Sequence, residues 1–154
     1  MSPRRPRRAG GTLRDGERRQ LALASRRAAS APPRLVGRER VLCDGGSRGN
    51  PGPAAIAAVV ITADGEVAAR RAVRIGRATA AEAEHRAILL GLELASAAGL
   101  TNPELRSDSQ LALAWAQDDA EVRRAAEQFA SVAWRWHPRH ENVAADELVR
   151  ELLW

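Results

Sequence analysis

The sequence has no lysine, no tyrosine and a single cysteine, Cys43. One cysteine excludes an intramolecular disulfide framework, and no apolar run approaches the roughly 18 residues that a membrane-spanning helix needs. We therefore expect a cytoplasmic protein, in a reducing setting and away from membranes. All 24 basic residues are arginines, which against 19 acids give a net charge of +5 and a pI of about 11.2. A charge of this sign points to an anionic partner such as nucleic acid.

The positive charge is unevenly distributed. Residues 1–34 hold ten arginines and two acids, a net +8, whereas residues 35–154 hold 14 arginines and 17 acids, a net −3. The change falls at a linker-like Ser-Ala-Pro-Pro stretch, residues 30–33. We predict an Arg-rich, flexible arm and linker over 1–34 and one folded domain over 35–154. The arm is either a solvated tail or a phosphate-binding segment, with a transit peptide as a weaker alternative.

Apolar periodicity predicts alternating strands and helices after the arm. The expected strands are 40–44, 54–62, 67–75, 104–107 and 131–136; the expected helices are 80–98, one from about 109, one around 121–130 and one from about 143. An Asp-Gly turn at 64–65 joins the second strand to the third as a hairpin, and the third alternates like a half-solvated strand. The pattern indicates an α/β protein in which three antiparallel strands come first and helices cover the sheet.

Four acids stand where such a sheet would bring them together. Asp44 ends the first strand, Asp108 follows the fourth, Asp146 lies early in the last helix, and Glu84 lies near the start of the 80–98 helix. Glu84 shares a helix face with Ile88 and so points toward the sheet. Converging carboxylates are relieved by raised pKa values or by divalent cations, and Mg²⁺ prefers oxygen ligands. Each acid taken singly could instead be a helix cap or a surface carboxylate.

Four segments then resemble the motifs of type 1 ribonuclease H, in the family's order. Residues 44–53 (DGGSRGNPGP) resemble its opening motif, and residues 79–87 (TAAEAEHRA) resemble its second motif. Residues 107–110 (SDSQ) resemble its third, and residues 138–148 (PRHENVAADEL) its closing segment. The resemblance implies the ribonuclease H-like fold, a five-stranded mixed sheet with three antiparallel strands, then two parallel ones, and helices on both faces.

The resemblance also implies an activity, the cleavage of the RNA strand of an RNA–DNA hybrid. The catalytic and metal-binding acids would be Asp44, Glu84, Asp108 and Asp146, holding two Mg²⁺ ions for which Mn²⁺ could substitute. Asp44 would contact both ions, Glu84 and Asp108 the ion nearer the leaving group, and Asp146 the ion of the attacking water. The alternative is a nucleic-acid-binding protein that keeps the fold with weak or no hydrolytic activity.

Hybrid recognition would depend on groups that sense the 2′-hydroxyl of RNA. The positions that match nucleic-acid contacts of the family are Gly45, Gly46, Ser47, Arg48, Asn50 and Gln110. Two departures weaken this set. Ala80 and Ala81 replace two asparagines that commonly read the minor groove, and the stretch 115–131 carries only two arginines where some members have a basic protrusion.

The histidines and tryptophans are assigned by position. His137 is our candidate for the histidine that assists acid–base chemistry or product release in some members, with His140 as a weaker candidate and a solvated loop histidine as the alternative. His85 is interpreted as a packing residue. We predict that the four tryptophans fill the core rather than stack on bases, and that Cys43 does the same from the strand face opposite Asp44.

Overall fold

The computed structural model describes residues 38–154, so the predicted arm lies outside the described residues and its assignment stays a prediction. The strands are β1 (Arg40–Ser47), β2 (Gly52–Ile61), β3 (Val67–Ala78), β4 (Glu104–Ser107) and β5 (Ala133–Trp136). The helices are α2 (Ala80–Ala97), α3 (Gln110–Asp118), α4 (Ala120–Ala126) and α5 (Val143–Leu153), with a 3₁₀ turn at Arg139–Glu141. The order of elements is the predicted one.

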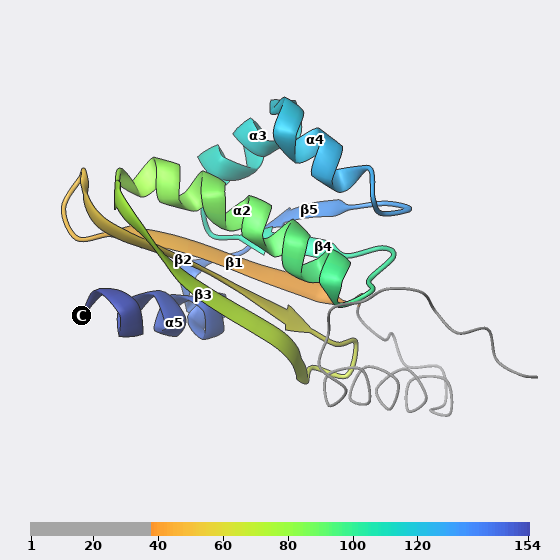
Figure 1. Ribbon diagram of the computed structural model, residues 1–154. Coiled ribbons are helices and arrows are strands. Elements are labelled where there is room, and N and C mark those ends of the chain that lie inside the picture. Colours follow the sequence, from red (N-terminus) through yellow and green to blue (C-terminus); the bar gives the residue numbers. More distant parts are fainter. Residues whose placement is uncertain (1–37) are drawn as a thin grey trace, which may run out of the picture.

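The five strands form one mixed sheet in the order β3-β2-β1-β4-β5. The β1–β2 and β2–β3 pairs are antiparallel, whereas β1–β4 and β4–β5 are parallel. Helices α2, α3 and α4 lie over one face and α5 lies under the other (Figure 1). The predicted fold class is confirmed.

Strand alternation divides the core between the two faces. On β1, Val41 and Cys43 pack under α2, while Leu42 packs against α5. Helix α2 approaches the sheet closely at Gly91, where an added Cβ would lie 2.3 Å from the sulfur of Cys43. Cys43 is fully buried there, as predicted for a core residue. Although α2 is the longest helix within residues 38–154, no helix in that range is long and apolar enough to cross a membrane.

The predicted alternation of β3 is interrupted. Its pairing with β2 shifts register near each end, so that Val60 faces Ala69 but Ile61 faces Val67. The extra residue, Ala68, is buried together with Ala69, because a bulge lets two successive side chains avoid solvent. Helix α4 also ends at Ala126, four residues earlier than expected.

The prediction that all four tryptophans fill the core is wrong for two of them. Trp115 and Trp134 pack against the core, but Trp136 is 46% exposed and Trp154 is 73% exposed. Trp136 ends the edge strand β5 and donates from its indole nitrogen to the carbonyl of Asp108, at 3.1 Å. Trp154 follows the last helix and lies beneath the guanidinium of Arg48, 5.7 Å from the ring centre.

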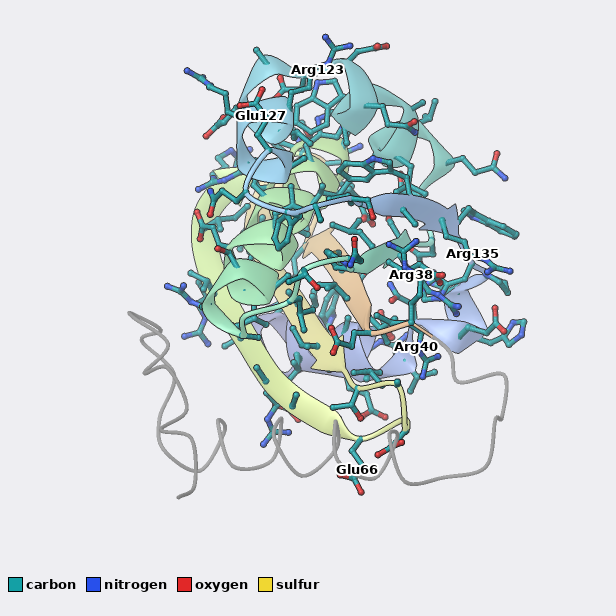
Figure 2. The ribbon with its side chains drawn as sticks, turned by 90° about the vertical axis from the view of Figure 1, so that its right-hand side faces the viewer. Arg38, Arg40, Glu66, Arg123, Glu127 and Arg135 are labelled. Atoms are coloured by element: carbon teal, nitrogen blue, oxygen red, sulfur yellow. The ribbon has the colours of Figure 1, made fainter. Side chains whose placement is uncertain are left out.

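Arginines gather where β1, β4 and β5 begin. Figure 2 shows Arg38, Arg40 and Arg135 on this side of the molecule. Arg40 is aligned with Glu104 in the β1–β4 ladder, and Arg38 donates to the carbonyl of Asn102, at 3.0 Å. Glu104, only 8% exposed, lies among these cations. This end of the sheet is therefore basic, in contrast to the end at which the four predicted acids lie.

Candidate active site

The site lies in a notch of the sheet. Strand β4 ends at Ser107, which is aligned with Cys43, whereas β1 continues to Ser47. From Asp44 onward, β1 therefore has no neighbouring strand on the β4 side. Asp108 follows β4 directly and reaches into the same space.

Helix α2 closes the notch from one face, and its position is set by the local sequence. Thr79 caps the helix in a reciprocal capping box with Glu82, and Asn50 accepts a further hydrogen bond from the N–H of Ala80, at 3.0 Å. The helix comes so near β1 that a Cβ at Gly45 would lie 2.4 Å from the carbonyl carbon of Ala83. Glycine at this position lets the first turns of α2 approach β1 and place Glu84 at the notch.

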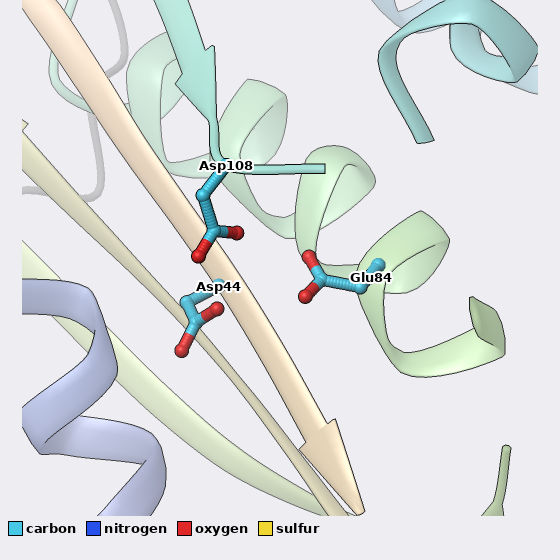
Figure 3. Close-up of side chains that lie close together, drawn as sticks. All are labelled: Asp44, Glu84 and Asp108. Carbon is cyan, nitrogen blue, oxygen red and sulfur yellow. The ribbon is translucent and has the colours of Figure 1, made fainter. Parts of the chain in front are cut away.

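Three of the four predicted acids converge there. Asp44, Glu84 and Asp108 each offer a carboxylate oxygen, and these three oxygens all lie within 4.8 Å of one another (Figure 3). Asp44 is 5% exposed, and the other two are half-buried. Three converging negative charges at this burial are unfavourable unless protons or cations offset them.

The pKa values follow from this crowding. The pKa of Asp44 is raised to about 7, mainly by burial and also by the negative charges of Asp108 and Asp146. Burial, with the charges of Asp44 and Asp108, raises the pKa of Glu84 to about 9. Near neutral pH, Glu84 therefore keeps its proton and Asp44 is partly protonated, unless a bound cation takes the place of these protons.

One arginine faces the acids. Arg139 Nε lies 3.9 Å from an oxygen of Asp108, and its charge lowers the pKa of both Asp44 and Glu84. The sequence analysis did not place Arg139 in the site. Its Pro-Arg position in the closing motif was the available signal. The Arg139 side chain is mostly exposed, which leaves the cluster with a partly solvated counter-charge.

Asp146 stands apart from the three clustered acids. It lies in the first turn of α5, where its backbone N–H donates to the carbonyl of Asn142, at 3.0 Å. Its carboxylate forms an ion pair with Arg150, one turn later, at 3.0 Å. The charge of Asp146 still contributes to the raised pKa of Asp44, so the two groups interact across the notch.

The donor set fits divalent cations. Glu84 Oε2 is buried and has no hydrogen-bond partner within the described part of the chain, which leaves it free to accept a metal bond. All three clustered side chains offer carboxylate oxygens, the ligands that Mg²⁺ and Mn²⁺ take. Asp44, Glu84 and Asp108 are thus the residues that could hold an ion, with Asp146 at the border of the site.

The predicted nucleic-acid contacts on β1 have structural roles. Gly45 is buried beneath α2, and an added Cβ at Gly46 would lie 3.1 Å from Val149 of α5. Ser47 is half-buried and donates through Oγ to the carbonyl of Ala78, at 2.9 Å. Packing therefore explains both glycines, and their contact with substrate stays a prediction.

The remaining predicted contacts lie at the surface around the notch. Arg48 and Asn50 are exposed in the β1–β2 turn, and Gln110 is exposed in the first turn of α3. Ala80 and Ala81 are exposed at the start of α2 and offer no side-chain hydrogen bond. This surface can approach a nucleic acid, but the first two residues of α2 offer it no side-chain donor.

The histidines differ sharply in environment. His137 is 3% exposed, and its Nε2 lies 3.0 Å from Oδ1 of the fully buried Asn142, which no sequence argument singled out. His140 is exposed on the 3₁₀ turn. His85 stacks on Trp115 with ring centres 3.8 Å apart, as expected of a packing residue. The acid–base or product-release role predicted for His137 stays a prediction, for a ring that has little contact with solvent.

The chain is similar to one protein family and to several known proteins. The model of a family described as Reverse transcriptase-like matches residues 42–152. A ribonuclease HI from Halobacterium salinarum is 39% identical over 133 residues, which cover 79% of this chain and 67% of that protein. The chain belongs to the type 1 ribonuclease H family. By this membership it is an enzyme of the ribonuclease H class.

Solved structures of the family agree with this assignment. The ribonuclease H1 of Halobacterium salinarum aligns with a TM-score of 0.68 and 38% identity, covering 75% of this chain and 96% of that one. The ribonuclease H domain of a Mycobacterium tuberculosis protein aligns with a TM-score of 0.69 and 36% identity, covering 73% of this chain and 91% of the solved one. The chain spans about a third, 34%, of the full-length bifunctional mycobacterial relative, to which it is 37% identical over 71% of its own length.

A third similar structure contains a nucleic acid. LC11-RNase H1 was solved in complex with an RNA/DNA hybrid, and it aligns with a TM-score of 0.64 and 28% identity over 73% of this chain and 94% of that one.

Proposed function

We propose that this protein is a metal-dependent endoribonuclease that hydrolyses the RNA strand of RNA–DNA hybrids. The observation that carries the proposal is the convergence of Asp44, Glu84 and Asp108 within 4.8 Å at the notch of a ribonuclease H fold. The hybrid-bound structure of a relative supports the choice of substrate.

The proposed cofactors are two Mg²⁺ ions, or Mn²⁺ in their place. Asp44, Glu84 and Asp108 would hold them, and Asp146 would add a ligand from α5. When bound, the two ions supply a nucleophilic water and stabilise the charge that develops on the leaving oxygen. Because the ions perform this chemistry, the acids of the chain act as ionised ligands, and they must lose the protons that their raised pKa values retain.

The other residues around the notch would bind and orient the hybrid. The backbone of residues 45–50 would approach the 2′-hydroxyls, and the amides of Asn50 and Gln110 would enter the minor groove. Oδ1 of Asn50 is already bonded to the start of α2, so its NH₂ group would make the contact with the substrate. Arg48 would bind a phosphate.

A nucleic-acid-binding protein without useful turnover is the second candidate. Ala80 and Ala81 favour it, because they leave the start of α2 without minor-groove donors. The acid cluster favours the enzyme, because binding a polyanion gives no reason to gather three carboxylates beside it.

Cleavage assays separate the two candidates. An RNA–DNA hybrid, a duplex RNA and a duplex DNA are each incubated with the protein and Mg²⁺ or Mn²⁺, beside an Asp44→Asn variant. We expect cleavage of the hybrid's RNA strand only, and by the wild type only. Hybrid cleavage no greater than the Asp44→Asn background would refute the enzyme.

We also propose that the arm, residues 1–34, adds phosphate contacts that the acidic domain lacks. Its net charge of +8 against −3 for the rest of the chain supports this division. Removing residues 1–34 should weaken hybrid binding about tenfold or more and reduce the slope of log affinity against log salt concentration. Equal affinity and slope for both chains would contradict the proposal.

A further inference from the structure

A chain of buried polar groups lies directly behind the acids. His137 Nε2 is 3.0 Å from Oδ1 of Asn142, and Nδ2 of Asn142 donates to the carbonyl of Cys43, at 2.9 Å. His137 is 3% exposed and Asn142 is fully buried. Hydrogen bonds this far from solvent hold one geometry firmly, because breaking one would leave a buried polar atom without a partner, even water.

These two residues contact three of the four acid-bearing segments. Cys43, whose carbonyl is held, immediately precedes Asp44 on β1. The backbone N–H of His137 donates to the carbonyl of Ser107, at 3.1 Å, and Ser107 immediately precedes Asp108. The backbone carbonyl of Asn142 accepts from Asp146 at the start of α5. One buried pair thus joins the backbones that present Asp44, Asp108 and Asp146.

The direction of the bonds identifies what His137 supplies. Since Nδ2 of Asn142 donates to Cys43, Oδ1 is the acceptor, and His137 must donate from Nε2. Its Nδ1 is buried without a hydrogen-bond partner within the described residues. We therefore assign the ring as neutral, with its one proton on Nε2. A histidine fixed in this way has no face open to an attacking water or a leaving group.

We propose that His137 is a positioning residue for the metal site: by holding Asn142 it sets the backbones of β1, β4 and α5 so that their acids share the same cations. The inference rests on the proposed function only in naming divalent cations as the ligand. Residues that orient metal ligands in this way typically change metal affinity 10–100-fold when they are replaced.

Direct metal binding tests the proposal without any nuclease assay. Mn²⁺ affinity is measured by titration calorimetry on the full chain for the wild type, His137→Leu and His137→Gln. Leucine fills the space but donates nothing, whereas glutamine can present an N–H near the position of Nε2. We expect an affinity about tenfold lower for the leucine variant and within about threefold of wild type for glutamine. Gln128→Leu, which removes an exposed hydrogen bond with Ser96 near the far end of α2, is the control and should match the wild type.

The outcomes are decisive in each direction. A folded His137→Leu protein that binds Mn²⁺ as tightly as the wild type overturns the proposal, and so does a glutamine variant as weak as leucine. If the His137→Leu protein does not fold, His137→Asn replaces it, because the shorter amide cannot reach Asn142. The proposal then requires weak Mn²⁺ binding by His137→Asn and near wild-type Mn²⁺ binding by His137→Gln. A wild type that binds no Mn²⁺ would instead overturn the proposed function, and this inference with it.

Steady-state kinetics distinguish positioning from acid–base chemistry. In the positioning role, His137→Leu lowers kcat at limiting Mn²⁺, excess Mn²⁺ restores it, and KM for the hybrid is unchanged. An acid–base role would leave kcat low at saturating Mn²⁺ and change the pH profile there. That second result would reject the positioning role.

Discussion

The two ends of β4 hold carboxylates in opposite ways. At its start, Glu104 forms ion pairs with Arg106 and Arg135, the latter at 3.8 Å. Just beyond its end, Asp108 has two further acids within 4.8 Å, and Arg139, its nearest arginine, is 3.9 Å away and largely solvated. The four residues of the strand span only about 13 Å.

Under the proposed function, the difference separates a structural acid, Glu104, from a metal ligand, Asp108. A chain with 24 arginines had the means to neutralise Asp108 as it does Glu104. Permanent pairing would satisfy the charge but would also block the carboxylate from exchangeable ligands. The incomplete neutralisation at the notch therefore leaves charge for a cation to complete. The following four predictions test this contrast.

The largest difference should appear in catalysis. Asp108→Asn should reduce hybrid cleavage on the order of 10³-fold, because it removes a ligand of the ions that stabilise the transition state. Glu104→Gln should remain within about threefold of wild type. Initial rates at saturating Mg²⁺ measure both, and equal losses in the two variants would mean that the ends of β4 do not differ in function.

Stabilisation by metal should follow the same division. At about 100 times its dissociation constant, Mn²⁺ should stabilise the wild type by about 2.7 kcal/mol, a rise of about 10 °C in Tm. Glu104→Gln should show the same Mn²⁺-induced rise in Tm, starting from a lower Tm without metal. Asp108→Asn should show a clearly smaller rise. Thermal melts with and without Mn²⁺ give the values. An undiminished increment in Asp108→Asn would exclude that acid as a ligand.

Stability without metal should respond in the reverse order. Glu104→Gln should cost about 2 kcal/mol of unfolding free energy, because a nearly buried acid lost from two arginines leaves their charges poorly paired. Asp108→Asn should cost less or even stabilise, since it relieves repulsion. Urea unfolding in the presence of EDTA provides the comparison, and a larger loss in Asp108→Asn would reverse our interpretation.

The pH dependence is the most specific effect. The folded-state pKa values of Asp44, about 7, and Glu84, about 9, lie above the ordinary values of 3.8 and 4.5. The contribution of their bound protons to the free energy of unfolding is therefore fully present below pH 4. It is lost as the pH rises to about 9, because the unfolded chain releases these protons at a lower pH than the folded chain does. In EDTA, the Tm of Asp44→Asn/Glu84→Gln minus that of the wild type should grow by about ten degrees or more between pH 4 and 9, since a pKa difference of one between the folded and unfolded chains corresponds to about 1.4 kcal/mol. A constant difference would show that the two acids ionise normally in the fold.

Much of the fold and all three clustered acids could be predicted from the sequence. The hairpin signal at residues 64–65 depends on local chemistry that a sequence displays directly. Asp44, Glu84 and Asp108 could be identified because each stands at a strand end or on an inward helix face, and their motifs resemble a known family.

The failures have a common physical reason, which is that they depend on neighbours distant in sequence. Trp136 is exposed because β5 is an edge strand, and Ala68 is buried because β3 slips against β2. Asn142 has no local signal of its role, since its partner Cys43 lies 99 residues away. The acid–base or product-release role of His137 stays a prediction, and its burial, which no local sequence signal shows, motivates the positioning role proposed above.

The short length of β4 has a consequence for how far this fold can be stabilised. Two or three more residues of β4 would add sheet hydrogen bonds to β1 beyond Cys43 and cover the open strand edge. They would also occupy the space in which Asp44, Glu84 and Asp108 meet. Selection for a tighter sheet at this point would thus oppose selection for activity, and stabilising substitutions compatible with catalysis should be sought at the opposite, arginine-rich end.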